Sequence, residues 1–260
     1  MTILDRLADY ARERTEKAKS IVSAEEIKNL AFSMPVGNFE FEKALSKDKL
    51  AFICECKKAS PSKGVIADDF PYLQIAEEYE NAGADCISVL TEPKWFLGRD
   101  EYLKEITEKV SVPCIRKDFT VDEYMIYEAK ILGAKAVLLI CSILTAERIK
   151  DYIKICDRLG ISALVEAHDE AEIKTAVNSG ARIIGVNNRN LKDFTVDTSN
   201  SRRMRELVPN DIIFLSESRV KIATDINLIR ESGADAVLIG ETLMRADDKT
   251  AKLAELKGLL

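Results

Sequence analysis

The chain has 260 residues, of which 47% are hydrophobic and 32% charged, and its 38 Lys and Arg against 44 Asp and Glu give a formal net charge of −6. This apolar content excludes a disordered chain, and the mild acidity supplies no global field that would attract nucleic acid or an anionic membrane. No apolar run approaches the roughly 18 residues that span a bilayer, and the charged start at Asp5 and Arg6 has no signal-peptide core. Composition therefore predicts a globular, cytoplasmic protein.

The first 49 residues precede the first strand that the apolar pattern predicts. Within them, residues 5–20 and 24–31 have helical spacing, and a turn follows at 34–37. The segment is too short for an independent domain. We therefore expect one domain over residues 1–260, with residues 1–49 as an N-terminal helical extension.

Eight short apolar runs then alternate with amphipathic stretches. The stretches at 72–81, 122–132, 146–159 and 170–179 have helical spacing, and a glycine of the kind that caps a helix follows four helical segments, at Gly83, Gly133, Gly180 and Gly233. The near-continuous apolar runs are typical of parallel strands covered by helices. They lie at residues 50–54, 84–90, 112–116, 134–140, 161–165, 181–186, 211–215 and 234–239.

Eight strand signals with a repeat of roughly 26 residues indicate eight βα units. Such units close most economically as an α/β fold of the (β/α)8 TIM barrel type, here with the N-terminal helical extension. The alternative is a doubly wound open sheet, but no GxGxxG follows the first predicted strand. The pattern therefore favours the barrel.

Six cysteines and one histidine limit the chemistry that the chain can perform. Cys54 and Cys56 form a CxC pair, and the other four cysteines stand alone in apolar stretches, so the CxxC pair of a zinc site is missing. We interpret all six as small buried residues of a reducing compartment. We interpret the single His168 as a loop residue, so catalysis must use Lys, Glu, Asp, Asn, Ser or Arg.

Charged and polar residues directly follow several predicted strands. In a barrel of this type the active site forms where the strands end, and Glu55 and Lys57, two residues apart, project to one face. The others are Lys117, Glu166, Asn187, Glu217 and Glu241. The pattern predicts a polar cluster at one mouth of the barrel. Structural alternatives stay open: an internal ion pair for Glu55 and Lys57, solvent-facing charges, or turn residues for the asparagines.

Six segments in order resemble the indole-3-glycerol phosphate synthase family of tryptophan biosynthesis, and the resemblance covers the whole chain. The family is a group of carboxy-lyases that close 1-(2-carboxyphenylamino)-1-deoxyribulose 5-phosphate to indole-3-glycerol phosphate with loss of CO₂ and water. The resembling segments are KKASPSKG at 57–64, SVLTE at 88–92, RKDF at 116–119, LVE at 164–166, GVNNRNL at 185–191 and LIG at 238–240.

The resemblance implies a catalytic role for each of five strand-end residues. Lys117 would be the general acid at the substrate carbonyl, with a pKa lowered by nearby cations and apolar walls. Glu166 would be the general base of the dehydration step, with Glu55 as a partner carboxylate. Lys57 would assist the acid or hold the anionic groups of the substrate, and Asn187 would orient the substrate hydroxyls or Glu55.

The resemblance also implies residues that bind the substrate. Arg189 and Ser60, in the same segment as Pro61, would bind the anthranilate carboxylate, for which a planar guanidinium is well suited. Trp95 and Phe96 either belong to the core or cover the substrate ring.

The phosphate group would be bound after the seventh and eighth strands. Backbone amides near Ser218, Arg219, Gly240 and Glu241 would bind the phosphate. We also place Ser218 with the catalytic residues. Family members usually have glycine where this chain has Arg219, and a glycine can adopt a backbone conformation that arginine disfavours. We expect the site to work nevertheless, because Gly240 and Ser218 remain.

The resemblance implies no cofactor and no metal, because the amine of the substrate supplies the electron sink for closure. The expected partner is a small phosphorylated substrate, not nucleic acid or a membrane; whether the protein is a monomer, or contacts other tryptophan-pathway enzymes, stays open. Two other functions also stay open. A sugar-phosphate isomerase on a related barrel is disfavoured because Cys54 and Cys56 face away from Glu55, and an inactive barrel is disfavoured by the intact charged set.

Overall fold

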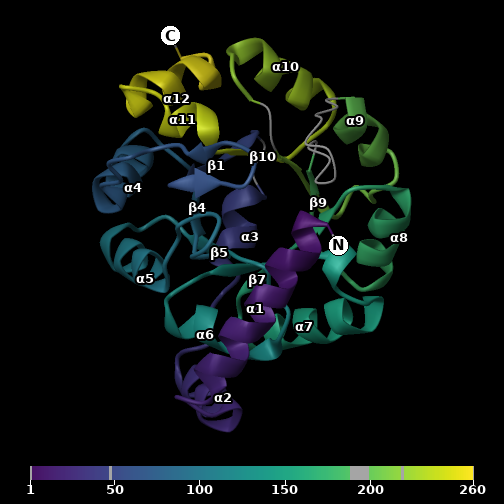
Figure 1. Ribbon diagram of the computed structural model, residues 1–260. Coiled ribbons are helices and arrows are strands. Elements are labelled where there is room, and N and C mark those ends of the chain that lie inside the picture. The colour runs from purple at the N-terminus through teal and green to yellow at the C-terminus, as the bar shows by residue number, and fades with distance from the viewer. Residues whose placement is uncertain (1, 47–48, 188–198, 218–219, 260) are drawn as a thin grey trace.

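The computed structural model describes residues 2–46, 49–187, 199–217 and 220–259. Eight parallel strands form a closed barrel in the order β1-β10-β9-β8-β7-β6-β5-β4. Figure 1 shows the helices as a ring around these strands. The predicted (β/α)8 barrel is therefore confirmed.

All eight predicted strands exist, and each begins one or two residues later than expected. The residue after each capping glycine still belongs to the preceding helix end: the Ala84, Ala134 and Ala181 amides donate to helix carbonyls at 2.9–3.1 Å. The strands are β1 Ala51–Cys56, β4 Cys86–Leu90, β5 Cys114–Lys117, β6 Ala136–Ile140, β7 Ser162–Ala167, β8 Ile183–Asn187, β9 Ile213–Glu217 and β10 Ala236–Ile239.

The outer helices follow the predicted pattern, and the glycines after α4, α6, α8 and α10 have φ between 77° and 88°. A short antiparallel pair, β2 Ala59–Ser60 and β3 Gly64–Val65, was not predicted and lies between β1 and α4. The helices are α4 Tyr72–Asn81, α5 Asp100–Lys109, α6 Glu123–Ile131, α7 Ala146–Leu159, α8 Glu170–Asn178, α9 Ser199–Arg205, α10 Ala223–Glu231, α11 Glu241–Met244 and α12 Lys249–Lys257, with a 3₁₀ turn η1 at Cys141–Ile143.

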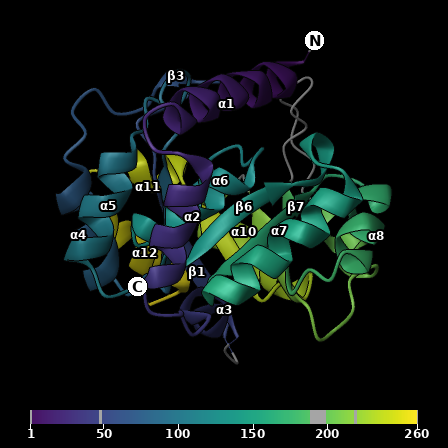
Figure 2. The ribbon, with the colours of Figure 1, turned by 90° about the horizontal axis from the view of Figure 1, so that it is seen from below.

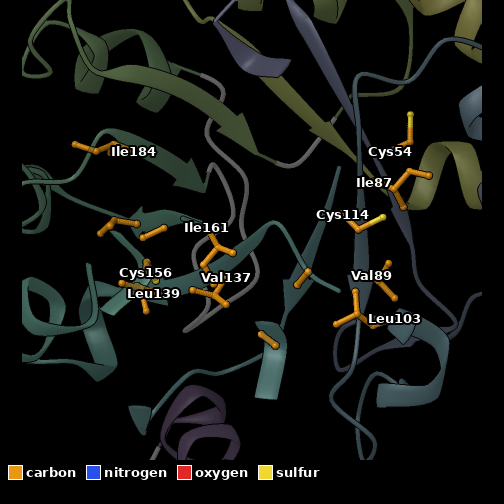
Figure 3. Packing of buried hydrophobic residues seen from close by; sticks show 14 of the residues in the cluster. Cys54, Ile87, Val89, Leu103, Cys114, Val137, Leu139, Cys156, Ile161 and Ile184 are labelled. Carbon is orange, nitrogen blue, oxygen red and sulfur yellow. The ribbon is translucent and has the colours of Figure 1, made fainter. Parts of the chain in front are cut away.

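Alternate residues of each strand face two different hydrophobic clusters. Along β1, Phe52 and Cys54 pack outward against the helices, whereas Ala51 and Ile53 pack inside the barrel. Figure 3 shows part of the outer cluster, including Cys54 and Cys114. All six cysteines are free and buried, as expected from the sequence.

The N-terminal helices cover both ends of the barrel (Figure 2). Helix α1, Ile3–Lys19, begins with a capping box between Thr2 and Asp5, and its apolar face packs on residues that include Phe119, just after β5. Helix α2 spans Ala24–Ser33. Helix α3, Glu40–Leu45, was not predicted, because its six residues are too few for a periodic signal. It is stabilised by Phe41 and Leu45, which are fully buried inside the barrel.

Among the described residues, no helix has the combined length and apolarity needed to cross a membrane.

Candidate active site

Side chains alternate between the two faces of each strand, and this alternation places five polar residues at the same end of the barrel. On β1, β5 and β7 the inward positions of Ile53, Ile115 and Leu164 belong to the interior cluster. Two residues further along each strand the inward position is polar, since the side-chain period is two. The inward polar residues at the strand ends are Glu55, Lys117, Glu166, Asn187 and Glu217.

Lys117 lies between two buried carboxylates. Its Nζ is 2.6 Å from Glu217 Oε2 and 3.3 Å from Glu166 Oε2. Burial opposes the ammonium charge, but Glu217, Glu166 and Glu55 together raise the pKa of Lys117 above its ordinary value. The expectation of a lowered pKa was therefore wrong, because it considered the cations near Lys117 and not the carboxylate that β9 brings to it.

Glu217 is a site residue to which the sequence analysis assigned no role. It is 2% exposed, and burial raises its pKa to about 7, with the repulsion of Glu166 and Glu55 acting against the attraction of Lys117. A Cβ on Gly185 of the neighbouring strand would lie 2.5 Å from Glu217 Oε1, so a side chain at this position would require the Glu217 carboxylate to move. The strand-end pattern places Glu217 in the predicted polar cluster, but nothing in the sequence indicates its contact with Lys117.

Glu55 and Lys57 form an ion pair at the same mouth. Lys57 Nζ donates to Glu55 Oε1, and Ser88 Oγ donates to Glu55 Oε2 at 3.4 Å. A Cβ on Gly240 would come within 2.8 Å of Lys57 Nζ, which places the end of β10 directly against this pair. The pair is thus both an internal ion pair and a neighbour of Lys117, whose pKa Glu55 helps to raise.

Asn187 ends β8 and is half-buried, and its register partner on β9 is Glu217. It belongs to the strand rather than to the turn that was its structural alternative. Asn188 lies outside the described residues.

His168 is a second residue to which the sequence analysis assigned no role in the site. It lies in the loop after β7, as expected, but its Nε2 is 3.3 Å from Glu166 Oε1 and its Nδ1 is 3.0 Å from Glu172 Oε2. Although burial opposes ionisation, Lys117 and His168 hold the pKa of Glu166 well below its usual range. A lone histidine two residues after a catalytic candidate was the available signal, since both side chains project to one face.

The described binding candidates lie around this cluster. Ser60 is buried at 6% exposure, and within the described part of the chain its Oγ has no hydrogen-bond partner. Pro61 follows it in the β2–β3 turn and is half-buried. The carboxylate of Glu241 is 3.1 Å from Arg245 Nε and 3.8 Å from Lys63 Nζ, so it is already paired with cations. The other candidates, Arg189, Ser218 and Arg219, lie outside the described residues.

Trp95 and Phe96 pack between α1 and the barrel. The Trp95 ring meets Tyr10 of α1 edge-on at 5.6 Å between centroids, and Phe96 lies 6.0 Å from Phe119. Both are partly buried against the interior cluster, which agrees with the core alternative. Across the described ranges, no three His, Cys, Asp or Glu side chains are grouped as metal ligands.

Comparison with known proteins identifies the family. A sequence model described as indole-3-glycerol phosphate synthase matches residues 4–256. The chain belongs to the indole-3-glycerol phosphate synthase family. A relative of that name from Ruminiclostridium cellulolyticum is 56% identical over 257 residues, which cover 98% of this chain and 99% of the relative. Another from Endomicrobium trichonymphae is 51% identical over 256 residues, 98% of this chain and 99% of the relative.

The similarity to solved structures outside the family concerns the fold alone. A 3-hexulose-6-phosphate synthase from Salmonella typhimurium superposes with a TM-score of 0.67 at 14% identity, covering 81% of this chain and 98% of that one. The family resemblance of the six sequence segments is thus confirmed by relatives of nearly full length.

Proposed function

We propose that the protein catalyses the reaction of its family, the ring closure of 1-(2-carboxyphenylamino)-1-deoxyribulose 5-phosphate to indole-3-glycerol phosphate with loss of CO₂ and water, in tryptophan biosynthesis. Family membership over residues 4–256 supports this reaction. The observation that carries it in the structure is Lys117, a buried ammonium held by Glu166 and Glu217 at the mouth of the barrel. This arrangement provides one acid and two proton acceptors within one small site.

The first step requires an acid beside the ketone oxygen. As the ring carbon that carries the carboxylate bonds to the ketone carbon, Lys117 donates a proton to the ketone oxygen. Glu217 touches Lys117 and has a pKa of about 7, so it can return a proton to Lys117 near neutral pH. The raised pKa of Lys117 keeps it protonated until the substrate is bound.

Loss of carbon dioxide and then of water completes the indole ring. Carbon dioxide leaves from the ring carbon, and its bonding electron pair neutralises the positive charge that closure placed on the amine. The new hydroxyl then takes a proton from the reprotonated Lys117 and leaves as water, while the neighbouring CH₂ carbon gives up a proton. Glu166 is placed to accept this proton, because its depressed pKa keeps it ionised.

The remaining groups would bind the anionic parts of the substrate. Lys57 offers an ammonium at the mouth, and the buried Ser60 hydroxyl can donate to the anthranilate carboxylate. Arg189 would pair with the same carboxylate, and the loops that contain Ser218 and Gly240 would bind the phosphate. The partner is then a small phosphorylated molecule, and a cytoplasmic location suits six free cysteines.

A sugar-phosphate isomerase on the same fold is less well supported. The thiols of Cys54 and Cys56 lie in the outer cluster, and burial raises the pKa of Cys56 well above its ordinary value. They therefore supply no acid or base to the mouth.

The decisive experiment mixes the protein with the carboxyphenylamino ribulose phosphate in EDTA and follows indole fluorescence. We expect fluorescence to rise with the wild-type protein and with Lys154→Met, which removes an exposed lysine on α7. Lys117→Met should give a rise about 10³-fold slower. If the wild-type protein at high concentration gave no rise in indole fluorescence, this result would contradict the proposed function.

A further inference from the structure

The imidazole of His168 lies between two carboxylates. Its Nε2 is 3.3 Å from Glu166 Oε1, on the side of that carboxylate opposite the Oε2 that meets Lys117. Its Nδ1 is 3.0 Å from Glu172 Oε2. Glu166 therefore has a cation-bearing side chain at each of its two oxygens.

The ring is held in this position by the start of α8. Glu172 Oε2 accepts a second bond from the His168 backbone N–H at 2.8 Å. Glu172 is itself fixed, because its backbone N–H donates to Oδ1 of Asp169, the N-cap of α8, at 2.9 Å. Two bonds from one residue to one carboxylate oxygen set the orientation of the imidazole plane.

A ring with a carboxylate near each nitrogen is stabilised as imidazolium: Nδ1–H donates to Glu172, while Nε2 forms an ion pair with Glu166 at 3.3 Å and makes no hydrogen bond among the described residues. Burial opposes this charge, but the interactions with Glu166 and Glu172 raise the pKa of His168 to about 10. Among the described residues, a further titratable group nearby is Cys141 on η1, whose pKa burial raises to about 12, with Glu172, Glu166 and Asp169 as its charged neighbours. It stays neutral and adds no competing charge.

We propose that His168 is a positioning residue for Glu166, and that it keeps this carboxylate ionised and aimed into the mouth while Lys117 gives its proton to the substrate. The inference rests on the proposed function, in which Lys117 is the acid and Glu166 the base. Once Lys117 has lost its proton, the nearby carboxylate of Glu217 would favour a proton on Glu166. His168 does not take part in that transfer, so its charge persists and Glu166 remains a base.

The first test uses the fact that the chain contains one histidine. In tag-free protein labelled with ¹³C-histidine, NMR should show a single imidazolium signal that does not titrate between about pH 5.5 and 8.5. In Glu172→Gln the signal should titrate at lower pH than in the wild type. A wild-type signal with a midpoint near the ordinary value of about 6.5 would overturn the proposal.

The second test is the pH profile of kcat for His168→Gln. Loss of the cation raises the pKa of Glu166, so we expect the acidic limb of the kcat profile to move to higher pH by the same amount, with kcat falling about tenfold per pH unit below that limb and recovering towards the wild type near pH 8.5. The acidic limb of the Glu172→Gln profile should move in the same direction. Glu170→Gln removes the same charge from an exposed position on the same helical turn and should match the wild type.

The outcomes separate the two proposals. A profile for His168→Gln that keeps the wild-type shape, whether or not its height or the melting temperature changes, would overturn the positioning role alone. No turnover by the wild-type protein would overturn the proposed function and this role with it. A shifted acidic limb that Glu170→Gln does not share would support both.

Discussion

Two buried cations stand side by side on β5, and they belong to different networks. Arg116 faces the outer helices: its guanidinium is 2.7 Å from Asp100 Oδ1 and 2.7 Å from Glu128 Oε2, and it donates to Thr91 Oγ1 at 3.2 Å. Lys117 faces the mouth and its carboxylates. Burial is similar, at 2% and 12% of each side chain exposed, so burial alone does not tell structural charge from catalytic charge.

The outer network continues to the N-terminal extension. Asp118 follows Lys117 in the chain. Its carboxylate accepts hydrogen bonds from the two terminal nitrogens of Arg14 on α1, at 2.7 and 3.2 Å, and from Thr91 Oγ1 at 2.7 Å. A planar guanidinium uses several fixed donors at once and keeps its proton, which suits it to joining elements.

The inner network is built from groups that can exchange protons. Lys117 is a single ammonium, and Glu217 has a pKa of about 7. The difference between the networks is therefore whether a proton can move, rather than how many charges are buried.

The largest expected effect is on chemistry at the inner network. Lys117→Met should lower kcat by about 10³-fold, because general acids contribute roughly 10²–10⁴. The fold should survive, since Glu217 can take up a proton when its partner is removed. Lys117→Arg keeps a charge that cannot be given up and should be almost as slow. Steady-state kinetics and urea denaturation measure both quantities, and a Lys117→Arg variant with near-normal kcat would contradict the proton-exchange distinction.

The outer network should respond in the opposite way. Arg116→Met leaves Asp100 and Glu128 without their shared cation and should cost about 3–5 kcal/mol of unfolding free energy. The kcat of the folded protein should fall far less than in Lys117→Met. Urea denaturation and kinetics on the same samples test this, and an unchanged midpoint with abolished activity would remove the distinction between the networks.

A smaller effect is expected where the outer network reaches α1. Arg14→Met removes the bidentate pair with Asp118, which keeps its Thr91 bond and a backbone bond from Phe119. We expect a loss of roughly 1–3 kcal/mol in unfolding free energy. Arg12→Met, whose pair with Asp9 is half exposed, should cost less than about 1 kcal/mol. Equal losses of unfolding free energy in Arg14→Met and Arg12→Met would show that Arg14 does not anchor α1.

The most gradual effect is a pH dependence of stability from Glu217. Its pKa is raised from 4.5 to about 7 by burial, so between these values the folded protein holds a proton that the unfolded chain has lost. The group therefore favours folding at low pH, and this contribution declines as the pH rises through that window. Glu217→Gln should gain roughly 2–3 kcal/mol in unfolding free energy relative to the wild type from pH 5 to 8 by urea denaturation. A pH-independent difference would show that Glu217 stays ionised.

The barrel and the polar residues at its strand ends could be predicted because they depend on local patterns. Period-two alternation sends Glu55 and Lys117 inward, and the glycines after α4, α6, α8 and α10 indicate that a strand begins a few residues later, whatever the rest of the chain does. Helix α3 could not be predicted in this way, because its six residues become a helix only when Phe41 and Leu45 enter the barrel.

The sequence by itself determined the eight βα units, the family and which strand ends carry charge. Only the tertiary structure decided which charges meet, because barrel closure brings β9 and β7 to Lys117 across 100 and 49 residues of chain. That closure reversed the expected pKa shift of Lys117, paired Lys117 with Glu217 and brought His168 into the site. The protonation of a buried group depends on its neighbours in space, and neighbours this distant in sequence carry no local signal.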